Sequence, residues 1–133
     1  MEDWYTRAGI QGEPNALYYG YGPNAYGDLN RKEALAIFRA AAEAGDVEAM
    51  FSTADLLKHL FQDARGAAEW YRKAAEAGHK DAMYELGMCY LRGEGVPKDD
   101  YTAYTWFREA GHNGHPDGQY LADDMLRVHE MML

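Results

Sequence analysis

A repeat with a period of 33 to 36 residues runs through the chain, and it constrains the fold more than any other feature. Glycines recur at steps of 33, 33 and 36 residues, with a large apolar residue eight positions before each and an aromatic residue six positions after. The glycines are Gly12, Gly45, Gly78 and Gly114, and the aromatics that follow them are Tyr18, Phe51, Tyr84 and Tyr120. Such self-similarity indicates stacked structural repeats rather than one closed globular core.

Each unit has the apolar spacing of two helices. In AAEWYRKAAEAG, Ala67, Trp70, Tyr71 and Ala74 occupy positions that fall on one face of a helix. The glycine that follows suits the left-handed position just past a helix end. The next segment, DAMYELGMCYLRG, has a second apolar stripe that includes Cys89. The units therefore predict an all-α solenoid of about three antiparallel helix pairs with a final helix.

The segment CYLRGEGVPKDD contains two glycines that could either hold a phosphate or turn the chain. A phosphate-binding loop follows a strand and ends in Lys-Ser or Lys-Thr, and neither condition is met here. Gly93 and Gly95 instead suit the end of a helix, and Pro97 prevents the chain from continuing as one. We therefore expect a turn, with Asp99 or Asp100 capping the next helix.

The chain is short enough to form a single domain, and the repeat pattern divides it into three parts. We predict an irregular N-terminal cap over about 1–30, repeats over about 31–114 and a C-terminal helix over about 115–131, all within one domain of residues 1–133. In the cap, Gly20, Gly22 and Pro23 stand where a helix would run. Because glycine and proline are poor helix formers, that helix is expected to be short or absent.

The net charge indicates the class of partner, and the absence of targeting signals indicates the compartment. The formal net charge is −9, so the surface repels phosphate backbones and anionic lipids. We therefore expect a protein or peptide of basic character as the partner, with no nucleic acid and no membrane. No secretory signal is evident, and no apolar run approaches the ~18 residues of a membrane span. These features predict a cytoplasmic monomer.

Two groups of residues could carry chemistry, and both have a simpler explanation. His112 and His115 lie near Asp117, but a zinc site needs three or four ligands. A helix-end cap or an exposed position is therefore favoured over metal binding. Cys89 is the single cysteine and falls on the buried stripe of its helix, so a core position is favoured over a nucleophile. We expect no catalytic residue, no cofactor and no metal.

The segment DAMYELGMCYLRGEGVPKDDYTAYTWFREAGHNG, residues 81–114, matches a known pattern. Its Ala, Leu-Gly, Tyr, Gly-x-Gly-Val, Asp, Ala and Trp-Phe positions occur in the order of the Sel-one-like repeat (SLR), a relative of the tetratricopeptide repeat. The resemblance covers about residues 31–126. The unit over 46–78 departs from it, because it lacks Gly-x-Gly-Val and has a shorter connection. The resemblance implies a right-handed α-solenoid with a concave face lined by the first helix of every pair.

By this resemblance, positions between the core residues of the first helices form a partner-binding surface on the concave face. The predicted binding residues are Tyr18, Phe51, Asp55, His59, Tyr84, Met88, Arg92, Tyr120 and Asp124. An aromatic column with acids beside it suits a peptide or helix that carries basic residues. The alternative is that the recurring aromatics are half-buried spacers between repeats.

The resemblance implies a non-catalytic protein-protein interaction module rather than an enzyme. A small acidic chain of this kind suits a bacterial adaptor or a cognate inhibitor of the immunity type, because an acidic surface can cover a basic active-site rim. A signalling or envelope-assembly scaffold is the alternative. Some cysteine-rich members of the family are described as penicillin-binding or β-lactamase-like, and they carry cysteine pairs that bridge the helices of each repeat. With one cysteine in this chain, hydrolase activity is not carried over.

Overall fold

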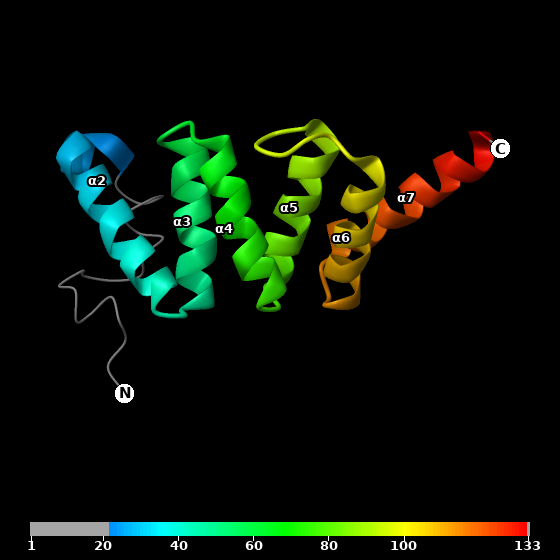
Figure 1. Cartoon of the computed structure of the whole chain (residues 1–133), viewed down its shortest axis with the longest axis horizontal. Helices are drawn as coiled ribbons and strands as arrows, with labels where there is room; N and C mark the ends of the chain where they lie inside the picture. Colours follow the sequence, from blue (N-terminus) through cyan, green and yellow to red (C-terminus); the bar gives the residue numbers. More distant parts are fainter. Residues whose placement is uncertain (1–21, 133) are drawn as a thin grey trace.

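The structure is a computed structural model that describes residues 22–132, with side chains described for residues 31–131. The described part contains six helices and no strand. These helices are α2 (Gly22–Glu43), α3 (Val47–His59), α4 (Ala64–Glu76), α5 (Lys80–Arg92), α6 (Asp100–His112) and α7 (Pro116–Met132). They stand side by side in a row, and α7 projects obliquely from one end (Figure 1). The main backbone contacts join helices that are consecutive in the chain. The predicted all-α solenoid of helix pairs is therefore confirmed.

Tight turns built on glycine separate the successive helix pairs. Gly45, Gly78 and Gly114 have φ values of 103°, 98° and 96°. At Gly45 and Gly78 an added Cβ atom would meet nothing within 4 Å, so the positive φ, rather than crowding, requires glycine there. The next residue caps the following helix: the Asp46 carboxylate, for example, accepts a hydrogen bond from the Ala49 amide at 3.1 Å.

The Gly-x-Gly-Val segment turns the chain between α5 and α6, as the sequence predicted. Gly93 ends α5 in the left-handed conformation, and its amide donates to the Cys89 carbonyl. Asp99 caps α6 by accepting hydrogen bonds from the amide and hydroxyl of Thr102. These two contacts satisfy backbone groups that the helix ends would otherwise leave unpaired.

Helix α2 begins earlier than the sequence analysis predicted. The irregular cap was expected to extend to about residue 30, whereas α2 starts at Gly22. Pro23 then lies in the first turn of the helix, where the missing amide hydrogen would have no partner within the helix anyway. The penalty for proline inside a helix therefore does not apply. The rest of the predicted cap, including Tyr18, lies outside the described residues.

The core combines small residues at the helix contacts with one large ring in each repeat. Phe38, Tyr71 and Phe107 occupy equivalent positions at the repeat period and are fully buried. The sequence analysis treated Trp70 as an equal member of the buried stripe. In the structure Trp70 is only half-buried, because it precedes Tyr71 by one residue and so faces a different side of the helix. Its ring lies beside Lys73, whose Nζ is 4.3 Å from the ring centroid. Tyr71 is therefore the main buried side chain of α4.

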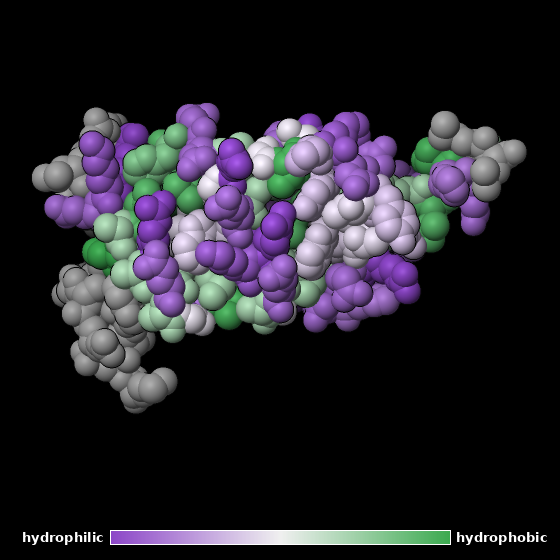
Figure 2. Space-filling view, viewed as in Figure 1, coloured by the Kyte–Doolittle hydropathy of each residue, from purple (hydrophilic) through white to green (hydrophobic). Residues whose placement is uncertain are grey.

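One face of the described part is largely hydrophilic (Figure 2). Polar side chains cover much of the face shown in Figure 2, with apolar side chains in smaller patches between them. No helix among residues 22–132 has both the length and the apolar character needed to cross a membrane.

Candidate functional site

The predicted binding residues that the structure describes lie on three first helices of successive pairs. They are Phe51, Asp55 and His59 on α3, Tyr84, Met88 and Arg92 on α5, and Tyr120 and Asp124 on α7. Together with the neighbouring acids Glu48, Asp81 and Asp117 we call them the first-helix face. An ion pair between Lys58 Nζ and Glu85 Oε2, 3.3 Å apart, links α3 to α5. The ninth predicted residue, Tyr18, lies outside the described part of the chain.

A histidine joins α3 to α5 through three contacts. The ring of His79 stacks on the ring of Phe51, with centroids 4.5 Å apart and planes 16° from parallel. Its Nδ1 accepts a hydrogen bond from the Ala82 amide at 3.1 Å and so caps α5. Its Nε2 lies 3.0 Å from Glu48 Oε1. Because Nδ1 accepts, the ring proton belongs on Nε2, which donates to the carboxylate.

The same arrangement recurs between α5 and α7. The ring of His115 stacks on Tyr84, again with centroids 4.5 Å apart, and its Nδ1 accepts from the Gly118 amide. Its Nε2 lies 3.5 Å from Asp81 Oδ1. We call these two arrangements histidine bridges. The sequence analysis proposed a helix-end cap or an exposed position for His115. In the structure His115 is a cap, and it accepts a hydrogen bond from an amide at the start of α7.

The histidine bridges divide the aromatic column into two kinds of residue. Phe51 and Tyr84 are half-buried in ring stacks that connect successive repeats. Tyr120 occupies the equivalent position on α7 and keeps 65% of its surface exposed. The first two rings therefore contribute to packing between repeats, while Tyr120 has most of its ring available for contact with another molecule.

Acidic side chains accompany these rings and remain accessible. The side chains of Glu48 and Asp81 are 75% and 52% exposed, even though each contacts a bridging histidine. On α7, Asp124 forms an ion pair with Arg127 at 2.7 Å. Exposed carboxylates of this kind create a negative potential that acts on charged molecules at a distance.

Asp55 is held within the helix pair by a buried tyrosine. The Tyr71 hydroxyl on α4 donates a hydrogen bond to Asp55 Oδ1 on α3. Burial raises the pKa of Asp55, and the hydrogen bond from Tyr71 opposes that rise only partly. Sequence analysis missed this pair. A signal was present, because the equivalent positions in the two adjacent repeats, Phe38 and Phe107, hold phenylalanine, whereas Tyr71 adds a hydroxyl in the repeat that contains Asp55.

We expect the variant Asp55→Asn to be more stable than the parent at about pH 7, with the difference shrinking toward about pH 4. The folded state binds the Asp55 proton more tightly than the unfolded state, because the pKa of Asp55 is raised on folding. Stability from this group therefore increases as pH falls through the folded pKa, and asparagine removes the dependence. Urea unfolding at both pH values measures it, and a stability difference that does not change with pH would contradict the assignment.

The described residues offer no obvious reactive centre. Cys89 is 4% exposed, and burial raises the pKa of its thiol to about 11, so the thiolate is scarce at neutral pH. This confirms its predicted core position. Within residues 31–131, no three His, Cys, Asp or Glu side chains come together in a way that could hold a metal ion.

Comparison with known proteins places this architecture among repeat proteins. The Sel1 repeat model matches residues 16–46, 47–79 and 80–115. Chitin synthase regulator SKT5 of Saccharomyces cerevisiae is 30% identical over 105 residues, which cover 74% of this chain and 15% of the yeast protein. Chitin synthase regulatory factor 1 of Schizosaccharomyces pombe is 34% identical over 90 residues, covering 63% of this chain and 19% of that protein. The match thus spans less than a fifth of either relative.

A solved structure agrees with the sequence relatives. The Sel1 repeat protein from Oxalobacter formigenes superposes with a TM-score of 0.67 and 28% identity, covering 90% of this chain and 92% of that one. The three repeat matches together cover most of the described residues and follow the boundaries of the helix pairs. The chain belongs to the Sel1 repeat family, whose members act as protein-interaction modules.

Proposed function

We propose that the chain is a small non-catalytic adaptor or cognate inhibitor that binds a basic protein or peptide on the first-helix face. The observation that carries the proposal is the exposed Tyr120 ring on α7. It lies three residues after Asp117, which occupies the same repeat position as the exposed acids Glu48 on α3 and Asp81 on α5. Family membership supports a role in protein interaction. The proposed contact residues are His59, Met88, Arg92, Tyr120 and Asp124, whereas Phe51, Asp55 and Tyr84 are held by contacts within the solenoid.

The charge of this face supports a basic partner. Glu48, Asp81 and Asp117 are exposed, and the net charge of the whole chain is −9. Opposite charge on a partner accelerates association and favours one orientation of docking, even where the final affinity comes from other contacts. An aromatic side chain at a protein interface commonly supplies much of that affinity.

A regulatory scaffold is the second candidate, and the names of two relatives favour it. Both yeast proteins are described as regulators of chitin synthase. This chain matches less than a fifth of either protein, so the proposed role is limited to a scaffold that holds another protein, such as an enzyme under regulation. Such a scaffold would use the same first-helix face, and identification of the partner separates it from an inhibitor.

We expect Tyr120→Ala to weaken binding of the partner about thirtyfold and to leave the melting temperature unchanged. The ring is 65% exposed, so its removal costs the fold little. The partner is first captured from native lysate with the tagged protein, identified and purified, and its affinity is then measured by titration calorimetry.

Tyr101→Ala is the matched control. Tyr101 is 75% exposed on α6, away from the first-helix face, so its removal should change neither affinity nor stability. An affinity that Tyr120→Ala leaves unchanged, or that both variants reduce equally, would contradict the proposed surface.

A further inference from the structure

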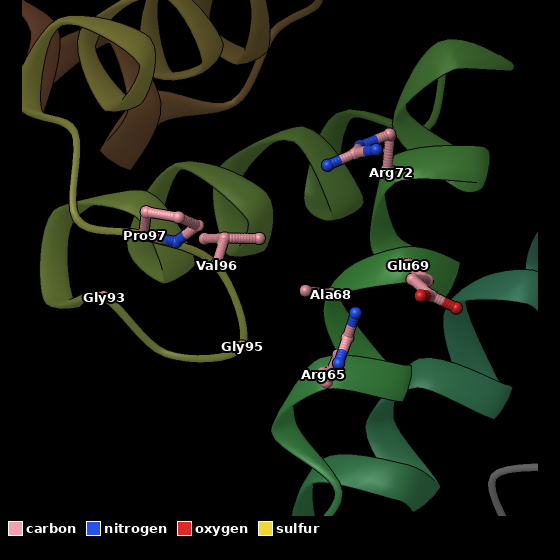
Figure 3. Close-up of a pocket in the computed structure, with 8 residues that line it drawn as sticks. All are labelled: Arg65, Ala68, Glu69, Arg72, Gly93, Gly95, Val96 and Pro97. Atoms are coloured by element: carbon pink, nitrogen blue, oxygen red, sulfur yellow. The ribbon is translucent and has the colours of Figure 1, made fainter.

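An open cleft of about 590 Å³ lies between α4 and the loop that joins α5 to α6 (Figure 3). Its lining residues come from two places, Arg65, Ala68, Glu69 and Arg72 on α4 and Gly93, Gly95, Val96 and Pro97 in the loop. None of these residues belongs to the first-helix face. The cleft is therefore a separate surface of the molecule.

The cleft forms because two of its residues have little bulk. Gly95 has a φ of 77°, and a Cβ atom there would lie 2.2 Å from the Ala64 carbonyl oxygen. The loop backbone thus rests directly on the first turn of α4. Val96 packs against the hydrophobic core, and Ala68 is buried in that core. Because the alanine side chain is small, it leaves space between α4 and the loop. The result is a floor of small apolar groups between the helix and the loop.

Two arginines give the cleft a positive charge in an acidic protein. Arg65 and Arg72 are seven residues apart on α4, so they lie on the same side of the helix. Figure 3 shows both guanidinium groups beside the space between α4 and the loop, whereas the Glu69 carboxylate points away from the loop.

The two guanidinium groups are also able to bind a ligand. Arg72 Nη2 donates a hydrogen bond to the Tyr90 hydroxyl at 3.2 Å, which orients the group and leaves its other N–H donors available. Arg65 has no hydrogen-bond or ion-pair partner among the described residues. Glu69 also lines the cleft, one helical turn from each arginine, but it forms no ion pair with either, so the two arginines outnumber the one acid.

We propose that this cleft binds an extended acidic segment of a partner protein. Guanidinium groups bind carboxylates through paired hydrogen bonds, and two of them about two helical turns apart suit two acidic side chains of one segment. The apolar surface of Val96 and Pro97 would contact the residue between them. A small anion such as phosphate would use only the arginines, so the apolar floor favours a peptide.

This second site would allow the chain to join two molecules of opposite charge. The first-helix face is acidic and the cleft is basic, and they are formed by different helices. The inference does not depend on the proposed function, because each surface has its own variants and its own probe.

The test uses the full chain and a fluorescein-labelled peptide of alternating glutamate and valine, measured by fluorescence anisotropy at low salt. We expect saturable binding, weakened roughly tenfold or more by Arg65→Gln and by Arg72→Gln, because each loses charge-assisted hydrogen bonds. The same peptide with glutamine in place of glutamate should not bind. Thermal melting checks that the variants remain folded, and Tyr120→Ala should bind the peptide as the parent does.

Arg108→Gln is the matched control, since Arg108 occupies the position of Arg72 one repeat later, on α6 rather than beside the cleft. It should bind the peptide like the parent. The proposal is overturned if the glutamine peptide binds equally well, if Arg65→Gln and Arg72→Gln bind normally, or if Arg108→Gln loses as much affinity as they do. It is also overturned if inorganic phosphate binds as tightly as the glutamate peptide.

Discussion

Tyr71→Ala is expected to destabilise the fold by about 3–5 kcal/mol, the cost of deleting a large ring from a well-packed core. Tyr71 is fully buried where α4 packs against its neighbours, with 0% of its surface exposed to solvent. Its removal also takes the hydroxyl donor away from Asp55, which is held at the same helix contact. Urea unfolding followed by circular dichroism measures the loss.

Two variants separate the contributions to this effect. Tyr71→Phe keeps the ring and removes only the hydrogen bond to Asp55, so we expect a loss of about 1–2 kcal/mol. Trp70→Ala changes the adjacent, half-buried ring and should cost less than Tyr71→Ala. If Trp70→Ala proves the more damaging of the two, the orientation of α4 described above is wrong.

His79→Ala should also destabilise the fold, with an expected loss of about 2–3 kcal/mol. A helix cap contributes about 0.5–2 kcal/mol and an aromatic stack about 0.5–1.5 kcal/mol, and His79 supplies both. Thermal and urea unfolding of the purified variant test the sum.

A variant with asparagine at position 79 separates the contribution of the helix cap from that of the aromatic stack. His79→Asn can still cap α5 but cannot stack on Phe51, so it should recover the capping part of the loss. His112→Ala removes an exposed histidine near the end of α6 and should leave stability unchanged. Equal stability of His79→Ala and His112→Ala would show that the histidine bridge contributes nothing.

The repeat period predicted the main features of the fold because they depend on local sequence. Glycine at 45 and 78 follows from the backbone conformation of the turn, and the buried position of Cys89 follows from helical spacing. The order of helices α3 to α7 follows from the same period. Each of these depends on residues within one unit, so one sequence is enough to predict them.

What the sequence left open depends on neighbouring units. Trp70 and Tyr71 are adjacent on one stripe, and which of them is buried depends on where the next helices pack. The start of α2 decides whether Pro23 is inside the helix or in its first turn. The histidine bridges had a signal, Gly-His at 78–79 and 114–115, but histidine is not a usual helix cap and its role depends on a ring in the preceding repeat.

The pairing of each helix mainly with its neighbours in the chain has a mechanical consequence. Pulling on the two ends of the row formed by residues 22–132 would load the turns and helix contacts in series, because its main backbone contacts join helices that are consecutive in the chain. The helix pairs could then separate one after another rather than in a single event. A change at α4, in the middle of the row, would divide it into two shorter arrays, whereas the same change in α7 would shorten it from one end.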